Sequence, residues 1–211
     1  MMRAVLLALA LSLCAGQAVA QSAPTPEMTA PVEPQLDPAR FVLGPSNAAV
    51  IVVIYGDLAC PDTRRAWGFL RADAAEHSNG VRIEFKHVVV HHNADIGARY
   101  LDAILVVDRS KAAAFIDAAF ADWPSGNAAG DAAAITTAMD RAATSAGLDV
   151  NAVHAALNAD QTAARIRADT AEHHAFLFHG IPGVVINGAR VWDEANGDGY
   201  SAPIDAALAG H

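Results

Sequence analysis

Residues 50–65 read VIVVIYGDLACPDTRR, and this stretch decides the fold. It begins with an apolar, β-branched run, which predicts a strand buried on both faces. A turn follows, and Cys60-Pro61 opens what we expect to be a helix running to about His77. Proline suits the first helical turn because its missing N–H would have no partner there. The stretch therefore predicts a strand, a turn and a cysteine at a helix N-terminus, where unpaired N–H groups and the helix dipole stabilise a thiolate.

The segments around this stretch predict an α/β fold. A short first strand is expected at residues 41–44 and the next at residues 49–55. Residues 81–87 alternate apolar and charged side chains, which predicts a half-exposed strand that residues 88–90 extend. The resulting strand-helix-strand unit puts Cys60 at the carboxyl end of a strand, the usual place for a functional turn.

The second half of the chain predicts a helical insertion followed by a hairpin. Residues 94 to about 178 are alanine-rich and should form three or four helices. Residues 184–186 and 190–192 are expected to be strands, because Asn187-Gly188 between them is a strong hairpin signal. A final short helix is expected at residues 200–209.

The N-terminus has the pattern of a secretory signal peptide, residues 1–20. Arg3 precedes an apolar core, and Ala18-Val19-Ala20 is a cleavage site. Residues 21–40 hold half of the protein's ten prolines, which predicts a disordered linker. We expect residues 41–211 to form one domain in a periplasmic or secreted protein.

Charge and cysteine content narrow the function. Cys14 would leave with the signal peptide, so Cys60 would be the only thiol of the mature chain, and no internal disulfide could form. Cys60 would then be a reactive thiol, a partner in an intermolecular disulfide, or an inert buried residue. A net charge of −9 argues against nucleic acid or an anionic membrane surface as partner. No segment after the signal is long and apolar enough to insert into a membrane.

Two motifs in this order resemble the DsbA-like branch of the thioredoxin superfamily. They are Cys60-Pro61 and the segment GIPGVVING at residues 180–188, and the resemblance covers residues 41–210. It implies a thioredoxin-like fold with an inserted all-helical subdomain. It also implies a thiol-disulfide oxidoreductase that needs no cofactor.

The resemblance assigns roles to individual residues. Cys60 corresponds to the nucleophile, and Pro182 to a cis-proline beside it. Ile181 would present its backbone to a bound peptide, and Pro61 and Asp62 would also lie on the substrate side. The chain departs from the family at Thr63, which stands where the second, resolving cysteine would be.

Thr63 restricts the chemistry that the site can perform. Its hydroxyl could donate a hydrogen bond to the Cys60 sulfur, but it cannot attack a mixed disulfide. Among the nearby charges, Asp57 and Asp62 would oppose a thiolate, whereas Arg64 and Arg65 would favour one if they fold back.

Three functions remain open. The first is monothiol exchange or sulfenic-acid chemistry through Cys60, with a thiol- or disulfide-bearing protein or a small thiol as partner. The second is a redox-inactive binding or chaperone-like module. The third is a metal-binding protein, because nine histidines include His91-His92, His173-His174 and His179. We expect these histidines to be solvated or at the edge of the core rather than metal ligands. The oligomeric state is left open.

Overall fold

The computed structural model describes residues 34–191 and 198–210. The predicted signal peptide, residues 21–33 of the predicted linker, and residues 192–197 between the hairpin and the last helix lie outside these residues. Trp192, the last residue of the predicted second hairpin strand, is among them.

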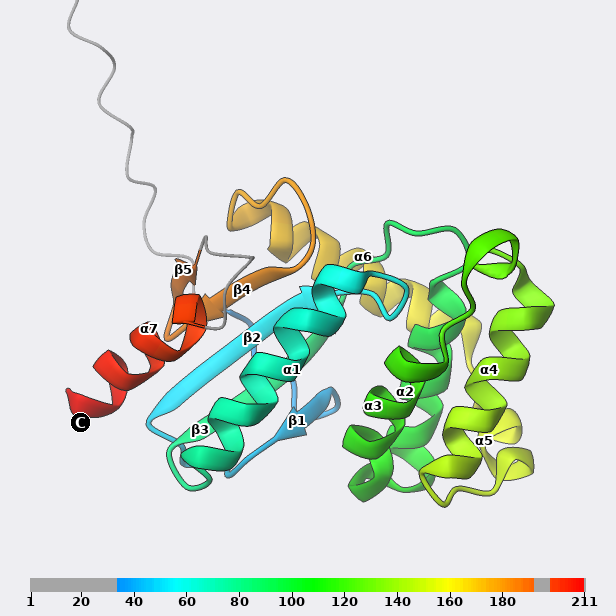
Figure 1. Ribbon diagram of the computed structural model, residues 1–211, viewed down its shortest axis with the longest axis horizontal. Coiled ribbons are helices and arrows are strands. Elements are labelled where there is room, and N and C mark those ends of the chain that lie inside the picture. The colour runs from blue at the N-terminus through cyan, green and yellow to red at the C-terminus, as the bar shows by residue number, and fades with distance from the viewer. Residues whose placement is uncertain (1–33, 192–197, 211) are drawn as a thin grey trace, which may run out of the picture. The chain divides into compact units, whose positions relative to one another are not determined.

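The described strands form a five-stranded mixed sheet in the order β1-β3-β2-β4-β5 (Figure 1). The strands are β1 (Phe41–Leu43), β2 (Val50–Gly56), β3 (Val81–His87), β4 (Gly183–Ile186) and β5 (Ala189–Val191). Central β2 pairs parallel with β3 and antiparallel with β4. Its residues 52–56 are all buried, which confirms the strand predicted from the apolar run.

Helices cover both faces of the sheet, because alternate residues of β2 pack in different clusters. Val52 and Ile54 belong to a core that includes Trp67 and Leu70 of α1 (Pro61–Glu76). Val53 and Tyr55 pack instead with the aromatic residues that follow α6 (Ala159–Ala175), namely Phe176 and Phe178. The last helix, α7 (Asp198–Ala209), packs beside α1, where Ser201 donates to Asp73.

The helical insertion contains more helices than the three or four predicted. It consists of α2 (Asp95–Val107), α3 (Ala112–Asp122), α4 (Ala132–Ser145), α5 (Val150–Ala156) and α6. The prediction missed the break between α5 and α6. There Leu157 leaves the helical conformation and the Asn158 side chain caps α6 by accepting from the Gln161 N–H. Asparagine is a strong N-cap, so this break had a sequence signal.

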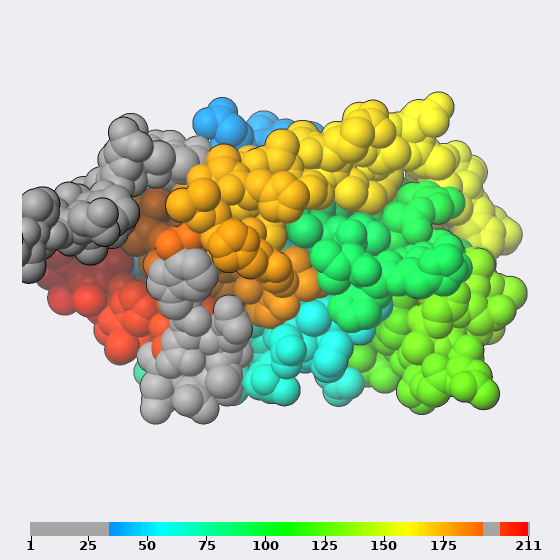
Figure 2. Space-filling model, turned by 90° about the horizontal axis from the view of Figure 1, so that it is seen from above, coloured from blue at the N-terminus to red at the C-terminus, as the bar shows by residue number. Residues whose placement is uncertain are grey.

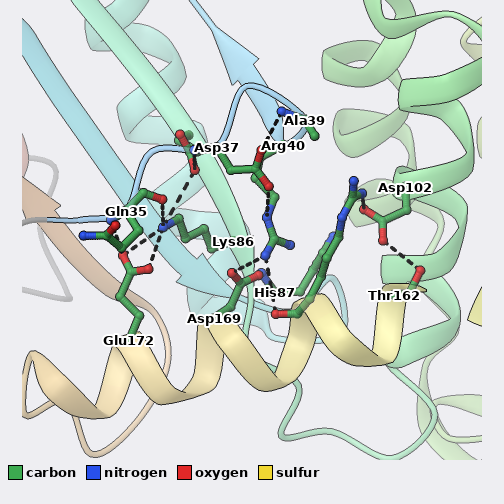
Figure 3. Close-up of polar contacts among 12 residues, drawn as sticks. Gln35, Asp37, Ala39, Arg40, Lys86, His87, Asp102, Thr162, Asp169 and Glu172 are labelled. Carbon is green, nitrogen blue, oxygen red and sulfur yellow. Dashed lines mark hydrogen bonds and ion pairs between the residues drawn. The ribbon is translucent and has the colours of Figure 1, made fainter. Parts of the chain in front are cut away.

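β3 is buried on both faces, so the prediction of a half-exposed strand was wrong. Glu84 and Lys86 are 0% and 1% exposed. Helix α6 lies over their face of the sheet and supplies carboxylates, so charged side chains there do not reach water (Figure 3). Lys86 Nζ contacts both carboxylate oxygens of Glu172 at 2.8 Å, and the Tyr55 hydroxyl donates to the same group. The predicted extension through residues 88–90 is also absent, because the strand ends at His87.

Residues 35–40, placed in the linker by sequence, pack onto this buried cluster. Lys86 donates to the Gln35 carbonyl, and the Asp37 N–H donates to Glu84. Arg40 is only 6% exposed and pairs with Asp169 of α6 at 2.7 Å (Figure 3). Folded structure therefore begins before Phe41.

No helix among the described residues is long and apolar enough to cross a membrane.

Candidate functional site

Cys60 is the N-cap residue of α1, as the sequence predicts. Its backbone is extended, and its Sγ accepts a hydrogen bond from the Thr63 N–H at 3.4 Å. Pro61 occupies the first helical turn, where its lack of an N–H costs nothing. The Cys60 residue is 5% exposed. The thiol therefore lies at the positive end of a helix dipole, with one backbone donor directed at the sulfur.

The loop before β4 supplies the second side of the site. The Ile181–Pro182 peptide bond is cis. The Cys60 thiol makes a long contact of 4.0 Å with the Ile181 carbonyl oxygen. Figure 2 shows the start of α1 (cyan) beside the loop that leads to Pro182 (orange). The structure thus brings Cys60 next to Ile181 and Pro182, which lie about 120 residues later in the sequence.

The Thr63 hydroxyl does not donate to the Cys60 sulfur, contrary to the expectation from the sequence. The backbone N–H, rather than the hydroxyl, donates to the Cys60 sulfur. The Thr63 side chain is fully buried, and its Oγ1 has no hydrogen-bond partner among the described residues. It packs against Gly56, where an added Cβ would lie 2.5 Å from both Cγ2 and Oγ1. Position 63 therefore supports the turn by packing.

Of the three charged residues that follow Cys60 at the start of α1, two form an ion pair with each other and the third, Arg64, does not. Asp62 and Arg65 form an exposed ion pair at 3.0 Å. Arg64 is exposed and has no ion pair among the residues described. A hollow of about 250 Å³ opens beside Cys60 and Arg64 and is closed on the other side by residues at the end of α3. Its lining is Leu58, Ala59, Cys60, Pro61, Arg64, Phe120, Ala121, Trp123 and Pro124.

From the sequence, Asp57 was expected only to be a charge near the thiol. In the structure its carboxylate is 1% exposed and accepts from the N–H groups of Ala59, Val90 and His91. The His91 Nδ1 also lies 3.0 Å from it. Asp57 thereby joins the Cys60 turn to the loop after β3. An aspartate two residues before a backbone N–H is a common turn signal, but its link to residues 90 and 91 requires the fold.

His173 holds the loop before Pro182. Its Nε2 lies 2.9 Å from the Gly180 carbonyl, which fixes the tautomer as a donor at Nε2. Burial lowers the pKa of His173, partly offset by this hydrogen bond. The neutral ring packs against Phe178 with centroids 5.2 Å apart.

The histidine clusters do not form a metal site in the part of the chain described. Among residues 34–191 and 198–210, no group of three or more His, Cys, Asp or Glu side chains is placed to hold a metal ion.

The sequence and the fold match a known family. The family model described as thioredoxin matches residues 37–206. The chain belongs to the thioredoxin family. The predicted resemblance is confirmed at the level of family and fold.

Solved structures of the thioredoxin fold agree with this assignment. A thioredoxin-like oxidoreductase from Silicibacter pomeroyi DSS-3 is 26% identical, with a TM-score of 0.66 over 82% of this chain and 92% of that one. BdbD from Bacillus subtilis is 17% identical, with a TM-score of 0.65 over 81% and 94%. The thiol-disulfide exchange protein α-DsbA2 from Wolbachia pipientis is 16% identical, with a TM-score of 0.69 over 81% and 88%. No curated protein matches this thioredoxin-family sequence.

Proposed function

We propose that this thioredoxin-family chain is an exported monothiol protein that exchanges disulfides through Cys60. The observation that carries the proposal is the position of the Cys60 sulfur. It lies at the N-terminus of α1, accepts from the Thr63 N–H and lies 4.0 Å from the Ile181 carbonyl. A helix N-terminus favours the thiolate, which is the reacting form.

The chemistry stops at a mixed disulfide unless another thiol enters. The Cys60 thiolate attacks a partner disulfide, a bond forms between Cys60 and one partner sulfur, and the other sulfur leaves as a thiolate. Cys60 is the only cysteine among the described residues, and Thr63 cannot attack the new disulfide. The partner is therefore released by an external thiol. The same thiolate could attack a peroxide, which would form a sulfenic acid and release water or an alcohol. One external thiol would then convert the sulfenic acid to a mixed disulfide and water, and a second would release Cys60 and form a disulfide of the two external thiols.

The test compares the folded protein with its own unfolded chain. The thiol of the folded protein should react with 2,2′-dipyridyl disulfide faster than the thiol in concentrated urea at the same pH. A Cys60→Ser variant gives the background. A folded-state rate at or below the unfolded rate would refute the proposal.

Export is the second part of the proposal. It rests on the sequence pattern of residues 1–20, and the solved relatives include a periplasmic thioredoxin-like protein from Salmonella enterica serovar Typhimurium. Intact mass of the protein recovered from the periplasm should correspond to a chain beginning at Gln21. Recovery of the chain with Met1 or Met2 at its start would contradict this.

A second candidate function is a redox-inactive binding module, which exposed apolar side chains favour. Val90 and Leu177 are 61% and 54% exposed. Val90 is in the loop that Asp57 holds, and Leu177 is in the loop that leads to Pro182. A Cys60→Ser variant would keep its partners if binding is the function. Under the monothiol proposal the same variant traps none.

A further inference from the structure

The hollow beside Cys60 has a chemical character that the proposed function does not specify. We propose that it binds the external thiol, and that this thiol is a small molecule carrying a negative group that Arg64 recognises. The inference rests on the proposed function, because it names the co-substrate of the same site.

The size and walls of the hollow point to a small occupant. Its volume of about 250 Å³ lies below the range of about 300–1,000 Å³ typical of sites for drug-sized ligands. Leu58, Phe120 and Trp123 give it apolar walls. Phe120 is 5% exposed, and the Trp123 indole is held by a hydrogen bond to the Ala129 carbonyl at 3.3 Å. The walls that face Cys60 are therefore fixed by the insertion.

The charged residues around the hollow favour a negatively charged ligand. The carboxylates nearest to it in sequence are already engaged. Asp62 pairs with Arg65, and Asp122 pairs with Arg141 at 2.9 Å. Asp57 is buried and accepts hydrogen bonds from several backbone N–H groups. Arg64 lines the hollow and has no carboxylate partner among the described residues. A guanidinium in this position favours a carboxylate, sulfonate or similar anion over a neutral or cationic ligand.

The placement brings a bound thiol to the sulfur that must be attacked. Cys60 lines the same hollow, one helical turn before Arg64. The small thiolate attacks the Cys60 sulfur of a mixed disulfide, a new S–S bond forms, and the partner leaves as a thiolate with the electron pair of the old bond. A second small thiolate then attacks the sulfur of the first and releases the Cys60 thiolate. Two small thiols become one small disulfide, and the partner disulfide becomes two thiols.

A matched pair of thiols tests the charge preference. The Cys60 mixed disulfide with pyridine-2-thiol is prepared, and release of pyridine-2-thione is followed on adding 2-mercaptoethanesulfonate or 2-mercaptoethanol. These thiols share a two-carbon chain and differ in charge. In the unaltered protein the sulfonate should react faster relative to the neutral thiol than it does in Arg64→Gln. We expect a change of about threefold to fivefold in this ratio, the size of a surface charge contact, and a smaller change at high salt.

Two further variants separate a local contact from a general charge effect. Arg167 is exposed on α6 and does not line the hollow beside Cys60. Arg167→Gln removes the same charge and should leave the ratio unchanged. Arg64→Lys keeps the positive charge, so its ratio should lie between those of Arg64→Gln and the unaltered protein. Equal ratios in the unaltered protein and Arg64→Gln, or equal losses in both glutamine variants, would overturn the inference.

A binding measurement keeps this inference separate from the proposed function. In Cys60→Ser, 2-(methylthio)ethanesulfonate cannot react, yet it should shift the Trp123 indole resonance in a saturable way. The shift should disappear in Cys60→Ser/Arg64→Gln. A saturable shift with no disulfide exchange by Cys60 would support the binding site and refute the monothiol function. Rapid exchange with no charge preference and no saturable shift would support the monothiol function and refute the binding site.

Discussion

The backbone N–H of Thr63 donates to the Cys60 sulfur over 3.4 Å, while the Thr63 hydroxyl has no partner among the described residues. The contact between Thr63 and the thiol is therefore made by the backbone, and the side chain makes no hydrogen bond to the sulfur. Its methyl and hydroxyl groups instead fill the space beside Gly56. Thr63 is held by packing, so the effects of substituting it on chemistry and on stability can be measured separately.

Thr63→Cys should restore the missing half of the exchange cycle. A thiol at this position can attack the Cys60 sulfur and expel a bound partner without an external thiol. Because the attack is intramolecular, the mixed disulfide should decay at least about tenfold faster than in the unaltered protein. Mass spectrometry of a peptide adduct in thiol-free buffer measures the decay, with Thr63→Ser as control. An adduct that persists equally in all three proteins would show that position 63 cannot reach the sulfur.

Thr63→Val should stabilise the protein. A buried hydroxyl without a partner costs about 1–3 kcal/mol, and valine keeps the branched shape without this cost. We expect a gain of about 1 kcal/mol in the free energy of unfolding by urea. Thr63→Ser keeps the hydroxyl and loses a buried methyl, so it should lose about 1 kcal/mol. The opposite order of stability would mean that the hydroxyl has a partner in solution.

Asp57→Ala should loosen the connection between the Cys60 turn and the loop after β3. It removes the acceptor of three backbone N–H groups, and we expect a loss of about 3 kcal/mol in unfolding free energy. Hydrogen exchange at the amides of Val90 and His91 should accelerate. Asp57→Asn retains one acceptor oxygen and should lose less.

The matched control for Asp57 is Asp160→Ala, at an exposed position in the first turn of α6. It should cost less than about 1 kcal/mol, the usual size of a helix-dipole contact. Unchanged protection of the Val90 and His91 amides in Asp57→Ala would contradict the anchoring role.

The sequence predicted those parts of the fold whose signals are local. Three signals depend only on neighbouring residues: the apolar run that begins at Val50, the helix start at Cys60-Pro61 and the Asn187-Gly188 turn. Each predicted a strand, helix or hairpin that the structure contains. The burial of Glu84 and Lys86 could not be predicted in this way, because the alternation in residues 81–87 is the usual sign of one solvated face. What buries them is α6, which lies far along the chain. Its Glu172 pairs with Lys86, and its Asp169 pairs with Arg40 beside them.

The same limit applies to the site. The resemblance led to Cys60, Ile181 and Pro182, which the structure brings together. The anchoring role of Asp57 depends on amides that only the fold places around it. The Thr63 hydroxyl was expected at the sulfur because hydroxyls commonly donate. The close approach of Gly56 takes up the space on that side instead, and no local pattern shows this.

Glu84 should make stability depend on pH, because its carboxyl is buried beside residues 35–40. Burial raises the pKa of Glu84 to about 7 from 4.5, against the opposing attraction of Lys86. A folded-state pKa above the unfolded value means that the folded state holds the proton more tightly. This contribution to stability is present below pH 4.5 and is lost as the pH rises towards 7. It amounts to roughly 3 kcal/mol.

The other buried groups titrate in the same range, so the total pH profile does not isolate Glu84. Burial raises the pKa of Asp169 to about 6, which acts in the same direction. Burial lowers the pKa of His87 to about 4, which acts in the opposite direction, since stability is then lost as the pH falls. Both groups remain in a Glu84 variant, and their effects cancel when the variant is compared with the unaltered protein.

Glu84→Gln therefore gives the decisive comparison. Glutamine resembles the protonated acid and does not titrate, so the variant should match the unaltered protein near pH 4. It should then become more stable than the unaltered protein as the pH rises, with a difference of roughly 3 kcal/mol at pH 8. Urea unfolding at each pH measures this difference. Glu76→Gln, at an exposed position of α1, removes the same formal charge outside the cluster and should show no such trend. A constant difference from pH 4 to pH 8 would mean that Glu84 stays ionised, with Lys86 and Arg82 compensating fully for its burial.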